Sequence, residues 1–358
     1  MRFGINGDWL GGDGVMKYFD KMPERGDFAY QQLVGPHAVT GKALHDTRGF
    51  FGLQYSKTSC FGCLYAEDGE TFAAVRSLMG PNGTPNPVTF LFLSTLINGE
   101  HIKIDKELGP KQAMTALPVV GLEGDTASWQ SRPEDEGNPW KITASGSEFS
   151  WKEDGLYDIR GKLLGKGMQW FLPGVEWGTF YVSQVYDVSG TCLDRAVKGF
   201  IACDQIYMAD GGAIHHKKDL IVNNNMHVIW WTFATVYKDG TYDLGSIMVG
   251  HDNLGFAILT DETGKVRCTN NIEGEVVHKD GSYFADTVRV VIDGDEEWEF
   301  LRDEKDEMID FVGGLPVTAQ QTGRWKRVGD KREPDRWLGW GETDRRNGTA
   351  RNIRGSDL

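Results

Sequence analysis

Two titratable residues, Asp204 and His227, lie within strongly apolar stretches of the chain. Burial in an apolar strand raises the pKa of a carboxyl group, so Asp204 is a candidate general acid. The imidazole of His227 titrates near neutral pH, and His227 shares one face of its predicted strand with Trp231 and Phe233. Each also has a structural alternative: Asp204 as a carboxylate held by backbone or arginine donors, and His227 as a satisfied core histidine. Our candidate catalytic set is Asp204, His227 and Tyr207.

Polar and aromatic neighbours of these residues are candidates for substrate binding. Gln205 and Tyr207 alternate to one face of their strand, opposite Asp204, where they can orient the carbonyl or hydroxyl group of a ligand. Glu176 and Trp177 precede a predicted strand, at a position suited to the mouth of a cavity. The full substrate-binding set that we predict is Gln205, Trp230, Trp231, Phe233, Trp177, Glu176, Tyr181 and Gln184.

Metal and cofactor motifs are weak or missing in the sequence. Adjacent histidines on a strand point to opposite sides, so His215 and His216 cannot easily bind one ion, and no third ligand follows at a suitable spacing. Cys60 and Cys63 form a single CxxC pair, which favours structural thiols. The sequence has neither a glycine-rich phosphate loop between a strand and a helix nor a Gly-x-Ser-x-Gly elbow. We therefore predict no metal site and no cofactor.

The elements that must position these residues are short strands. Turn pairs of the Asp-Gly, Asn-Gly or Thr-Gly type, which favour tight hairpins, recur at 68–69, 98–99, 239–240, 263–264, 280–281 and 293–294. Stretches rich in β-branched and aromatic residues lie between them, at 71–77, 89–97, 180–188, 226–237 and 287–292. Helical periodicity is limited to 16–22 and, more weakly, to 303–311. The pattern predicts an antiparallel meander.

The stretch 226–237 indicates where two layers of structure meet. Its residues are largely apolar on both faces, so neither face is expected to contact bulk water. With 358 residues, the chain exceeds what one hydrophobic core usually supports, which predicts two domains. A meander of many strands hides its edges by closing into barrels. We therefore predict an all-β fold of two antiparallel barrels that meet near residues 185–200, with 226–237 lining an apolar cavity.

Residues 167–266 resemble the core of the lipocalin-like family that includes carotenoid 1,2-hydratases, AttH-type proteins, kievitone hydratases and fungal decalin-forming Diels–Alderases. The segments that carry the resemblance are GMQWFLPGVEWGTFYVSQVYDVSGT (167–191), VKGFIACDQIY (197–207), MHVIWWTFATVYKDGTYDLGSIMV (226–249) and GFAILTDETGKV (255–266). The ending GWGETDRR (339–346) resembles the close of the family's second barrel. The resemblance implies two consecutive lipocalin-like antiparallel β-barrels with an apolar cavity, over residues 1–190 and 191–358.

The family also has a Gly-x-x-x-x-Asp-His-x-Trp motif at the start of the second barrel, and its His and Trp belong to the catalytic set of the hydratases. The matching stretch here begins at Gly199 and has Asp204 at the Asp position. Gln205 stands at the His position and Tyr207 at the Trp position. An amide has no usable acidity near pH 7, so Gln205 cannot protonate an alkene. This departure argues against hydration by the family's route.

Composition limits the partners and the compartment. The net charge of −14 repels phosphate backbones, and the arginine-rich segment 324–354 also contains acids and tryptophans, so we predict no nucleic-acid partner. Five cysteines form an odd set, which favours reduced thiols in a cytoplasm. The first ten residues lack a secretory pattern, and the apolar runs are too short for a bilayer. We expect a soluble, cytoplasmic protein without a membrane span.

These inferences favour a cofactor-free enzyme that acts on a hydrophobic isoprenoid, aromatic or polyketide-like molecule. Water addition or elimination, isomerisation and cyclisation all fit a shaped apolar cavity with one or two proton-transfer groups. The alternative is a non-catalytic lipocalin-like carrier of a hydrophobic ligand, and a third class is a partner-binding protein with an exposed aromatic patch. Convergence of Asp204, His227 and Tyr207 favours the enzyme, whereas scattered polar groups favour the carrier.

Overall fold

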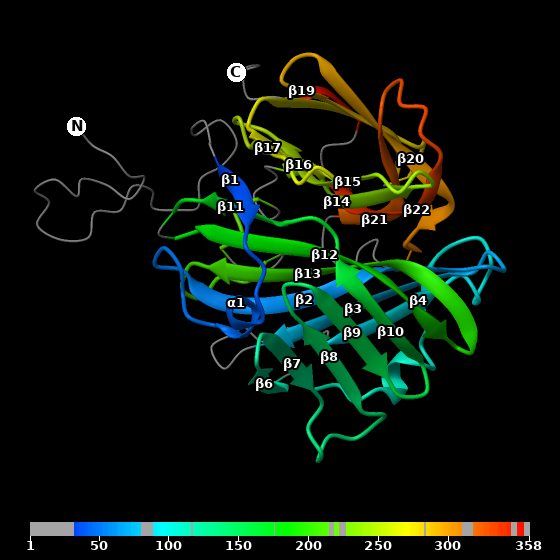
Figure 1. The fold of residues 1–358 in the computed structure, drawn as a ribbon. Coiled ribbons are helices and arrows are strands. Elements are labelled where there is room, and N and C mark those ends of the chain that lie inside the picture. The colour runs from blue at the N-terminus through cyan, green and yellow to red at the C-terminus, as the bar shows by residue number, and fades with distance from the viewer. Residues whose placement is uncertain are drawn as a thin grey trace, which may run out of the picture.

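The computed structural model describes residues 32–79, 89–115, 117–174, 176–214, 218–221, 227–282, 284–309, 318–344 and 349–353. These residues form two antiparallel β-sheets that stack on each other, with the second sheet (yellow to red) above the first in Figure 1. The predicted all-β fold of two antiparallel units is confirmed, with the first sheet forming a half-barrel and the second a nearly closed barrel. No helix in the described ranges is long and apolar enough to cross a membrane.

The larger sheet contains 13 strands within the described residues. They are β1 (Leu33–His37), β2 (Gln54–Ala66), β3 (Thr71–Met79), β4 (Phe90–Ser94), β5 (Lys103–Ile104), β6 (Val119–Glu123), β7 (Thr126–Gln130), β8 (Trp140–Ala144), β9 (Glu148–Glu153), β10 (Tyr157–Leu163), β11 (Gly167–Leu172), β12 (Thr179–Cys192) and β13 (Arg195–Met208). Their order is β5-β4-β3-β2-β13-β12-β10-β9-β8-β7-β6, and β11 pairs with both β12 and β1. The short helices α1 (Gly41–His45) and η1 (Gly109–Lys111) accompany this sheet.

The second sheet contains ten strands within the described residues. They are β14 (His227–Tyr237), β15 (Tyr242–Gly250), β16 (Gly255–Asp261), β17 (Val266–Thr269), β18 (Ile272–His278), β19 (Ala285–Ile292), β20 (Glu296–Glu307), β21 (Thr318–Arg327), β22 (Pro334–Asp344) and β23 (Ala350–Ile353). Their order is β17-β16-β15-β14-β22-β21-β20-β19-β18-β23. The short connection between β17 and β18 brings the two ends of this order close together, so the barrel is nearly closed.

The turns follow the local signals in the sequence. All six glycines of the predicted turn pairs have positive φ angles; Gly69, for example, has φ 88° and Gly240 has φ 86°. Glycine adopts this region without the steric cost that a Cβ atom brings, and it matches the twist of a tight hairpin. Gly69 joins β2 to β3 and Gly240 joins β14 to β15, so these turns set the register of long strands that line the candidate site.

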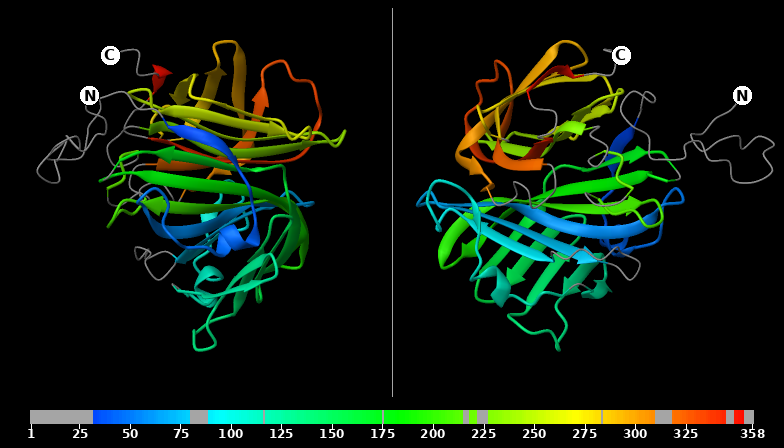
Figure 2. Two further views of the ribbon diagram at one scale, coloured as in Figure 1. Left: turned by 60° about the vertical axis from the view of Figure 1, so that its left-hand side comes forward. Right: turned by 180° about the vertical axis from the view of Figure 1, so that it is seen from behind.

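The layer between the two sheets is here called the seam, and both views in Figure 2 show it crossing the molecule. On β14, Trp230, Ala234 and Val236 pack in the hydrophobic cluster that joins the sheets. Trp231 and Phe233 on the same strand pack inside the second barrel instead. The predicted burial of both faces of 226–237 is therefore confirmed, because each face belongs to a different core.

The seam is closed by aromatic contacts from both sheets. The ring centroids of Phe61 on β2 and Trp340 on β22 are 5.1 Å apart, and those of Trp170 on β11 and Phe256 on β16 are 5.7 Å apart. An ion pair between Arg336 and Asp187 crosses the seam with an N–O distance of 2.5 Å. Asp187 lies within 185–200, where the barrels were predicted to meet, and that meeting point stays a prediction.

One predicted helix is wrong and another lies outside the described residues. Within 303–311, the residues up to 307 belong to β20, which pairs with β19 and β21. Trp298 and Phe300 are buried and alternate with more exposed neighbours, so strand periodicity overrides the helical propensity of the charged residues that follow. Residues 16–22 lie outside the described ranges.

The division of the chain into two units also needs restating. The predicted boundary between 190 and 191 falls within β12, and both β12 and β13 belong to the first sheet. The chain leaves the first sheet after Met208 and enters the second at His227. We therefore propose that the two units divide between residues 209 and 226 rather than at 190, so that the β12–β13 hairpin stays in the first unit.

Candidate active site in the seam

Asp204 lies on the seam face of β13 and is fully buried. The register of the sheet places Ser59 of β2 on one side of it and Ser183 of β12 on the other. Neighbouring positions on this face are apolar, because Ala202 and Ile206 belong to the cluster between the sheets. A short polar row therefore crosses an otherwise apolar wall.

Both oxygens of the Asp204 carboxyl group accept hydrogen bonds from hydroxyl groups. Tyr181 Oη donates to Oδ2, and Ser183 Oγ donates to Oδ1 over 2.5 Å. Tyr181 and Ser183 are two residues apart on β12, so their side chains leave the same face of the strand. Neither donor is a cation, and the carboxyl group is therefore held in place without being neutralised.

Burial raises the pKa of Asp204 to about 7, against the hydrogen bonds from Ser183 and Tyr181 and the positive charge of Lys57, which lower it. Desolvation dominates because a carboxylate in an apolar layer loses the solvation that water provides. Near neutral pH the group is therefore present in both its acid and its base form. A general acid or base works best when its pKa lies near the operating pH.

Lys57 is the cation whose positive charge lowers the pKa of this carboxyl group. It lies on β2 opposite Ile206, which makes it the diagonal neighbour of Asp204 on the seam face. The register shifts directly beside it, between Ile206 and Tyr207, and such bulges re-aim side chains. Burial lowers the pKa of Lys57 to about 8, although the charges of Asp204 and Asp219 oppose this. Its ammonium group stabilises the carboxylate through space without a direct ion pair.

The second sheet supplies the opposite wall of the site. Trp230 on β14 pairs in register with Glu342 on β22 and with Met248 on β15. The buried carboxylate of Glu342 accepts a hydrogen bond from Gln320 Nε2. Its charge contributes to a raised pKa of Tyr181, after the larger effects of burial and of the Asp204 carboxylate. Glu342 is therefore close enough to the Tyr181–Asp204 pair to act on it electrostatically.

Trp170 Nε1 and Thr232 Oγ1 are among the buried polar atoms in the seam that have no hydrogen-bond partner within the described part of the chain. The Trp170 ring stacks on Tyr181 with centroids 5.2 Å apart and an interplanar angle of 9°. Thr232 lies on β14, beside Trp340 in the register of the second sheet. A buried donor without a partner is costly, so both groups are suited to a hydrogen bond with a bound molecule.

Gln205 and Tyr207 lie on the other face of β13, as the alternation of the strand predicted. Gln205 Nε2 donates to the carbonyl oxygen of Leu44 over 3.0 Å, and Tyr207 Oη donates to that of Asp46 over 3.2 Å. These bonds anchor the α1 segment to the first sheet. The structure does not bring Tyr207 together with Asp204, so the predicted catalytic set does not converge as a whole.

The remaining predicted residues divide among several environments. Trp231 packs on Trp325 and Phe300 inside the second barrel, with ring centroids 5.8 and 4.8 Å apart. His227 begins β14, and its side chain lies outside the described residues. Gln184 lies on the opposite face of β12 from Tyr181 and donates to the Cys203 carbonyl.

The pair predicted at a cavity mouth is also split. Trp177 is buried in the cluster between the sheets, whereas the Glu176 side chain is 57% exposed and forms an ion pair with Lys218 over 3.4 Å. Of the predicted binding residues, Tyr181, Trp177 and Trp230 therefore share the seam with Asp204.

Cysteines and histidines contribute little to the described site. Cys60 is directly opposite Cys203, with sulfur atoms 3.5 Å apart, while Cys63 points to the seam. His215 and His216 lie outside the described residues. Within the described ranges there is no group of three metal-ligating side chains. The prediction of a site without metal or cofactor stays a prediction.

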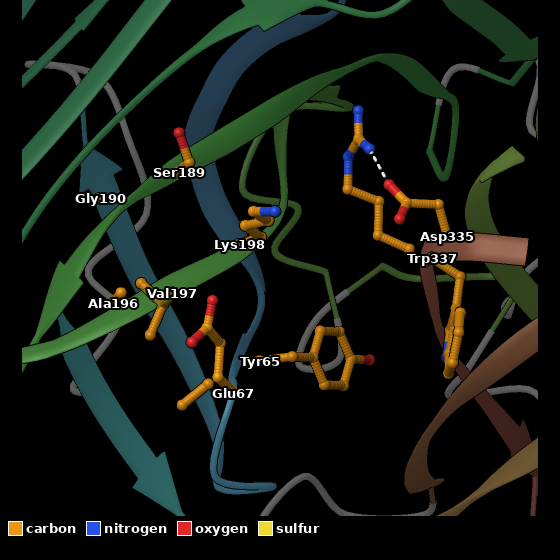
Figure 3. Close-up of a pocket in the computed structure, with 11 residues that line it drawn as sticks. Tyr65, Glu67, Ser189, Gly190, Ala196, Val197, Lys198, Asp335 and Trp337 are labelled. Atoms are coloured by element: carbon orange, nitrogen blue, oxygen red, sulfur yellow. Dashed lines mark hydrogen bonds and ion pairs between the residues drawn. The ribbon is translucent and has the colours of Figure 1, made fainter. Parts of the chain in front are cut away.

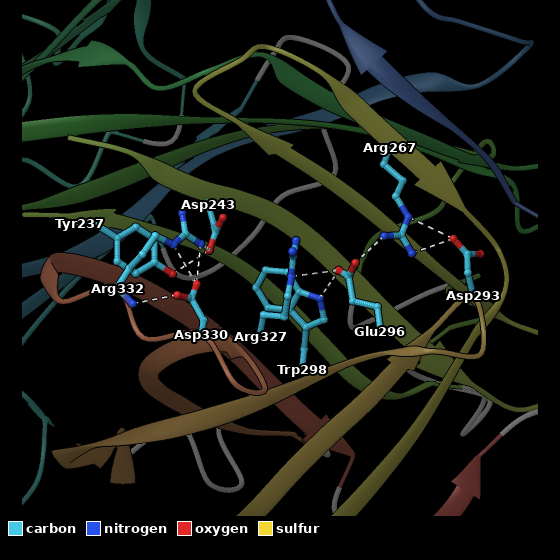
Figure 4. Close-up of polar contacts among 9 residues, drawn as sticks. All are labelled: Tyr237, Asp243, Arg267, Asp293, Glu296, Trp298, Arg327, Asp330 and Arg332. Atoms are coloured by element: carbon cyan, nitrogen blue, oxygen red, sulfur yellow. Dashed lines mark hydrogen bonds and ion pairs between the residues drawn. The ribbon is translucent and has the colours of Figure 1, made fainter. Parts of the chain in front are cut away.

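The titratable groups at the outer edge of the second barrel differ from the Asp204 cluster. Figure 4 shows Arg332 bound to Asp330 and Asp243 over 2.6 Å, with Tyr237 donating to the same Asp243 oxygen over 2.7 Å. A second group in the same view links Arg267 to Asp293 and Glu296. These carboxylates are each paired with a cation, and they stabilise the ends of hairpins.

Sequence reasoning missed Ser183, Lys57 and Glu342. Ser183 could have been found, because it lies two residues from Tyr181 in an apolar strand and therefore shares its face. Lys57 and Glu342 gave no such local signal, since their proximity to Asp204 and Tyr181 depends on pairing between distant strands and between the two sheets.

No protein-family model matches the chain, and no curated protein matches it. Among solved structures, an AttH-type protein of Nitrosomonas europaea is 15% identical, with a TM-score of 0.46, 82% of this chain covered and 94% of that one. CghA with Sch210972 is 13% identical, with a TM-score of 0.46 and coverages of 80% and 88%. Kievitone hydratase of Nectria haematococca is 10% identical, with a TM-score of 0.42 and coverages of 91% and 98%.

An AttH-type protein and a kievitone hydratase, two of the protein types named in the resemblance predicted from the sequence, are among these similar structures. At such identities and TM-scores the comparisons do not indicate which reaction this chain performs.

Proposed function

We propose that the protein is a cofactor-free enzyme that transfers a proton to or from a hydrophobic small molecule held in the seam. The observation that carries the proposal is the Asp204 carboxyl group, which is fully buried, held by two hydroxyl donors and shifted to a pKa of about 7. A structural carboxylate at this depth is normally compensated by a cation in direct contact. Asp204 has none.

In the proposed reaction, protonated Asp204 donates its proton to an alkene or carbonyl group of the substrate. Tyr181 and Ser183 then stabilise the carboxylate that remains, since both already point their hydroxyl groups at its oxygens. Lys57 stabilises the same negative charge through space. Regeneration of the acid takes a proton from another atom of the substrate or from water. The first outcome is an isomerisation after protonation of an alkene or carbonyl group, or an elimination when the proton instead goes to a substrate hydroxyl group that leaves as water. The second outcome is a hydration, in which the water oxygen bonds to the cationic carbon and its proton returns to Asp204.

The walls of the seam supply shape and a dry environment. Trp170, Trp230 and Phe61 present large aromatic surfaces to the layer that contains Asp204. Such walls favour an isoprenoid, aromatic or polyketide-like substrate, and they can hold a flexible chain in a conformation that cyclises. Proton transfer by a positioned side chain typically contributes about 100- to 10,000-fold in rate.

A carrier of hydrophobic ligands is the second candidate. It is favoured by one observation: Gln205 and Tyr207 bond to backbone carbonyls and do not face Asp204. A carrier needs apolar walls but no titratable group tuned to neutral pH. The two candidates therefore differ in what Asp204 does to a bound molecule.

The experiment exposes the protein in D₂O to a conjugated polyene, a prenylated phenol and a linear polyketide. Mass spectrometry then reads the gain or loss of water, deuterium bound to carbon, and cyclised products. We expect turnover of at least one compound, with a drop of at least about tenfold in Asp204→Asn. The matched control is Asp154→Asn, because the Asp154 side chain is 48% exposed and remote in sequence. EDTA is expected to leave the rate unchanged.

Two results would contradict the proposal. If the compounds bind but emerge without deuterium or mass change, the protein is a carrier. If turnover occurs at the wild-type rate in folded Asp204→Asn, the reaction belongs to another group, and circular dichroism establishes that the variant is folded.

A further inference from the structure

A groove opens at the end of the seam farthest from Asp204, with a volume of about 460 Å³. It lies where β2 and β12 end and where β13 and β22 begin, and Figure 3 shows side chains from both sheets around it. Tyr65, Lys198 and Ser189 form one row of its wall, because the register pairs Lys198 with Tyr65 on one side and Ser189 on the other. Trp337 of β22 faces this row from the second sheet.

The groove is separate from the candidate active site. Lys198 precedes Asp204 by six residues on the same face of β13, a distance of about 20 Å along a strand. The intervening residues on that face, Phe200 and Ala202, are buried in the cluster between the sheets. Phe61 and Trp340 pack on each other in the same layer. A molecule in the groove therefore does not reach Asp204.

Two aromatic rings in the groove are fixed by one carboxylate. Tyr65 Oη donates to Asp303 Oδ2 over 3.1 Å, and Trp337 Nε1 donates to Asp303 Oδ1 over 2.7 Å. The ring centroids of Tyr65 and Trp337 are 6.1 Å apart, with an interplanar angle of 45°. Because Asp303 holds both polar ends, the rings are positioned before any ligand arrives, and binding costs little further side-chain entropy.

The charged groups of the groove differ in how they are compensated. Arg336 binds Asp187 and Asp335, so its charge is already paired. Lys198 and Glu67 are exposed, and neither forms an ion pair with any described residue. Both residues line the groove, and Figure 3 shows Lys198 above the Tyr65 ring and Glu67 to the left of it. The groove thus offers one unpaired cation and one unpaired anion next to a fixed aromatic surface.

We infer that this groove binds an aromatic zwitterion, a planar ring system that carries both a carboxylate and an ammonium group. The ring lies against Tyr65 and Trp337, the carboxylate meets Lys198, and the ammonium group meets Glu67. A ligand with only one charge satisfies one of these residues and is repelled by the other. The inference does not depend on the function proposed for Asp204.

The test uses three indole probes that differ only in charge: L-tryptophan (zwitterion), indole-3-propionate (anion) and tryptamine (cation). Isothermal titration calorimetry with the full chain is expected to give the tightest binding for tryptophan, by about three- to fivefold over the other two, the effect of one exposed ion pair. Lys198→Met is expected to remove the advantage of tryptophan over tryptamine. Glu67→Gln is expected to remove its advantage over indole-3-propionate.

Three variants complete the experiment. Trp337→Leu is expected to weaken all three probes by at least about tenfold, because it removes the ring surface. Lys265→Met, at an exposed lysine in the β16–β17 turn, and Asp204→Asn are expected to leave binding unchanged. Equal affinities for the three probes, or equal effects of Lys198→Met and Lys265→Met, would overturn the inference. So would the absence of binding at millimolar concentrations.

Discussion

The first sheet buries one carboxyl group on each of its two faces, and the two are held in opposite ways. Glu153 points into the first barrel, where Arg76 binds both of its oxygens over 2.7 and 2.8 Å and Trp151 Nε1 donates over 2.9 Å. Arg76 in turn lies over the rings of Phe90 and Trp140. Asp204 points into the seam, and its donors within the described part of the chain are two neutral hydroxyl groups.

Burial alone does not distinguish the two carboxyl groups; the presence of a contacting cation does. Burial raises the pKa of both carboxyl groups, but at Glu153 a contacting guanidinium opposes that effect and satisfies the charge. A carboxylate paired in this way has its charge satisfied in place by the contacting guanidinium group. Asp204, with Lys57 acting only through space, remains able to gain and lose a proton near neutral pH. Asp204 is therefore the candidate acid because no described cation forms an ion pair with it.

The largest loss of stability is expected when the ion pair between Arg76 and Glu153 is broken. Glu153→Gln leaves the Arg76 guanidinium buried without its counter-charge, which should lower the free energy of unfolding by about 3–5 kcal/mol. Urea unfolding followed by circular dichroism measures it. The double variant Arg76→Met/Glu153→Leu is expected to recover most of the loss. If Glu153→Gln costs no more than Asp204→Asn at the same pH, the contrast between the two carboxyl groups is wrong.

The two faces of β14 provide a second contrast. Trp231 is fully buried inside the second barrel, so Trp231→Ala should lower the free energy of unfolding by about 3–5 kcal/mol. Trp230 is only partly buried and faces the seam, so Trp230→Ala should cost less stability and should instead weaken ligand binding. Thermal unfolding and ligand titration on the same two proteins distinguish these effects. Equal losses of stability would mean that the seam is as tightly packed as the barrel core.

A third prediction concerns the dependence of stability on pH. The folded-state pKa of Asp204, about 7, lies above its ordinary value of 3.8, so the folded protein holds this proton over a range in which the unfolded chain has lost it. Stability from Asp204 is thus present at low pH and is lost as the pH rises through 7. Relative to wild type, Asp204→Asn should gain about 2.6 kcal/mol between pH 5 and pH 8. If the free energy of unfolding of Asp204→Asn falls relative to wild type as the pH rises, the raised pKa of Asp204 is wrong.

The smallest expected effect is a shift in the pKa of Asp204 when one of its hydroxyl donors is removed. Tyr181 donates to the Asp204 carboxylate, and this bond lowers the pKa of Asp204. Tyr181→Phe should therefore raise that pKa further, by roughly one unit, as expected for a hydrogen bond to a charged group. The control is Tyr186→Phe, because Tyr186 donates to the Ser145 carbonyl inside the first barrel. A shift of equal size in both variants would mean that the donor bond is not its cause.

The sequence predicted the features that depend on local pattern. Glycines in turn pairs marked the hairpins, and the apolar residues on both faces of 226–237 marked the strand shared by two cores. Asp204 was identified because an acid is unusual in an apolar strand. The alternation that placed Gln205 and Tyr207 opposite Asp204 was also correct, yet pattern alone could not show that they bond to the backbone around α1.

Features that depend on contacts between distant strands could not be predicted. Lys57 precedes Asp204 by more than a hundred residues, and only the pairing of β2 with β13 makes them neighbours. The charge of Glu342 acts on Tyr181 across the seam. This proximity depends on how the two sheets pack, which the sequence of one strand does not show. The charged run at the end of β20 has helical propensity, and its pairing with β19 and β21 decides against it. In each case tertiary pairing overrides the local signal.

Infrared titration measures directly whether Asp204 exchanges a proton near neutral pH, and it needs no known substrate. The protein is labelled with ¹³C at the aspartate side-chain carboxyl carbon. The difference between wild type and Asp204→Asn isolates this one group. We expect a protonated-carboxyl band that is present near pH 6, disappears with a midpoint of about 7 and is absent from the variant. A difference spectrum with no protonated carboxyl above about pH 5, the range of an ordinary aspartate, would contradict it.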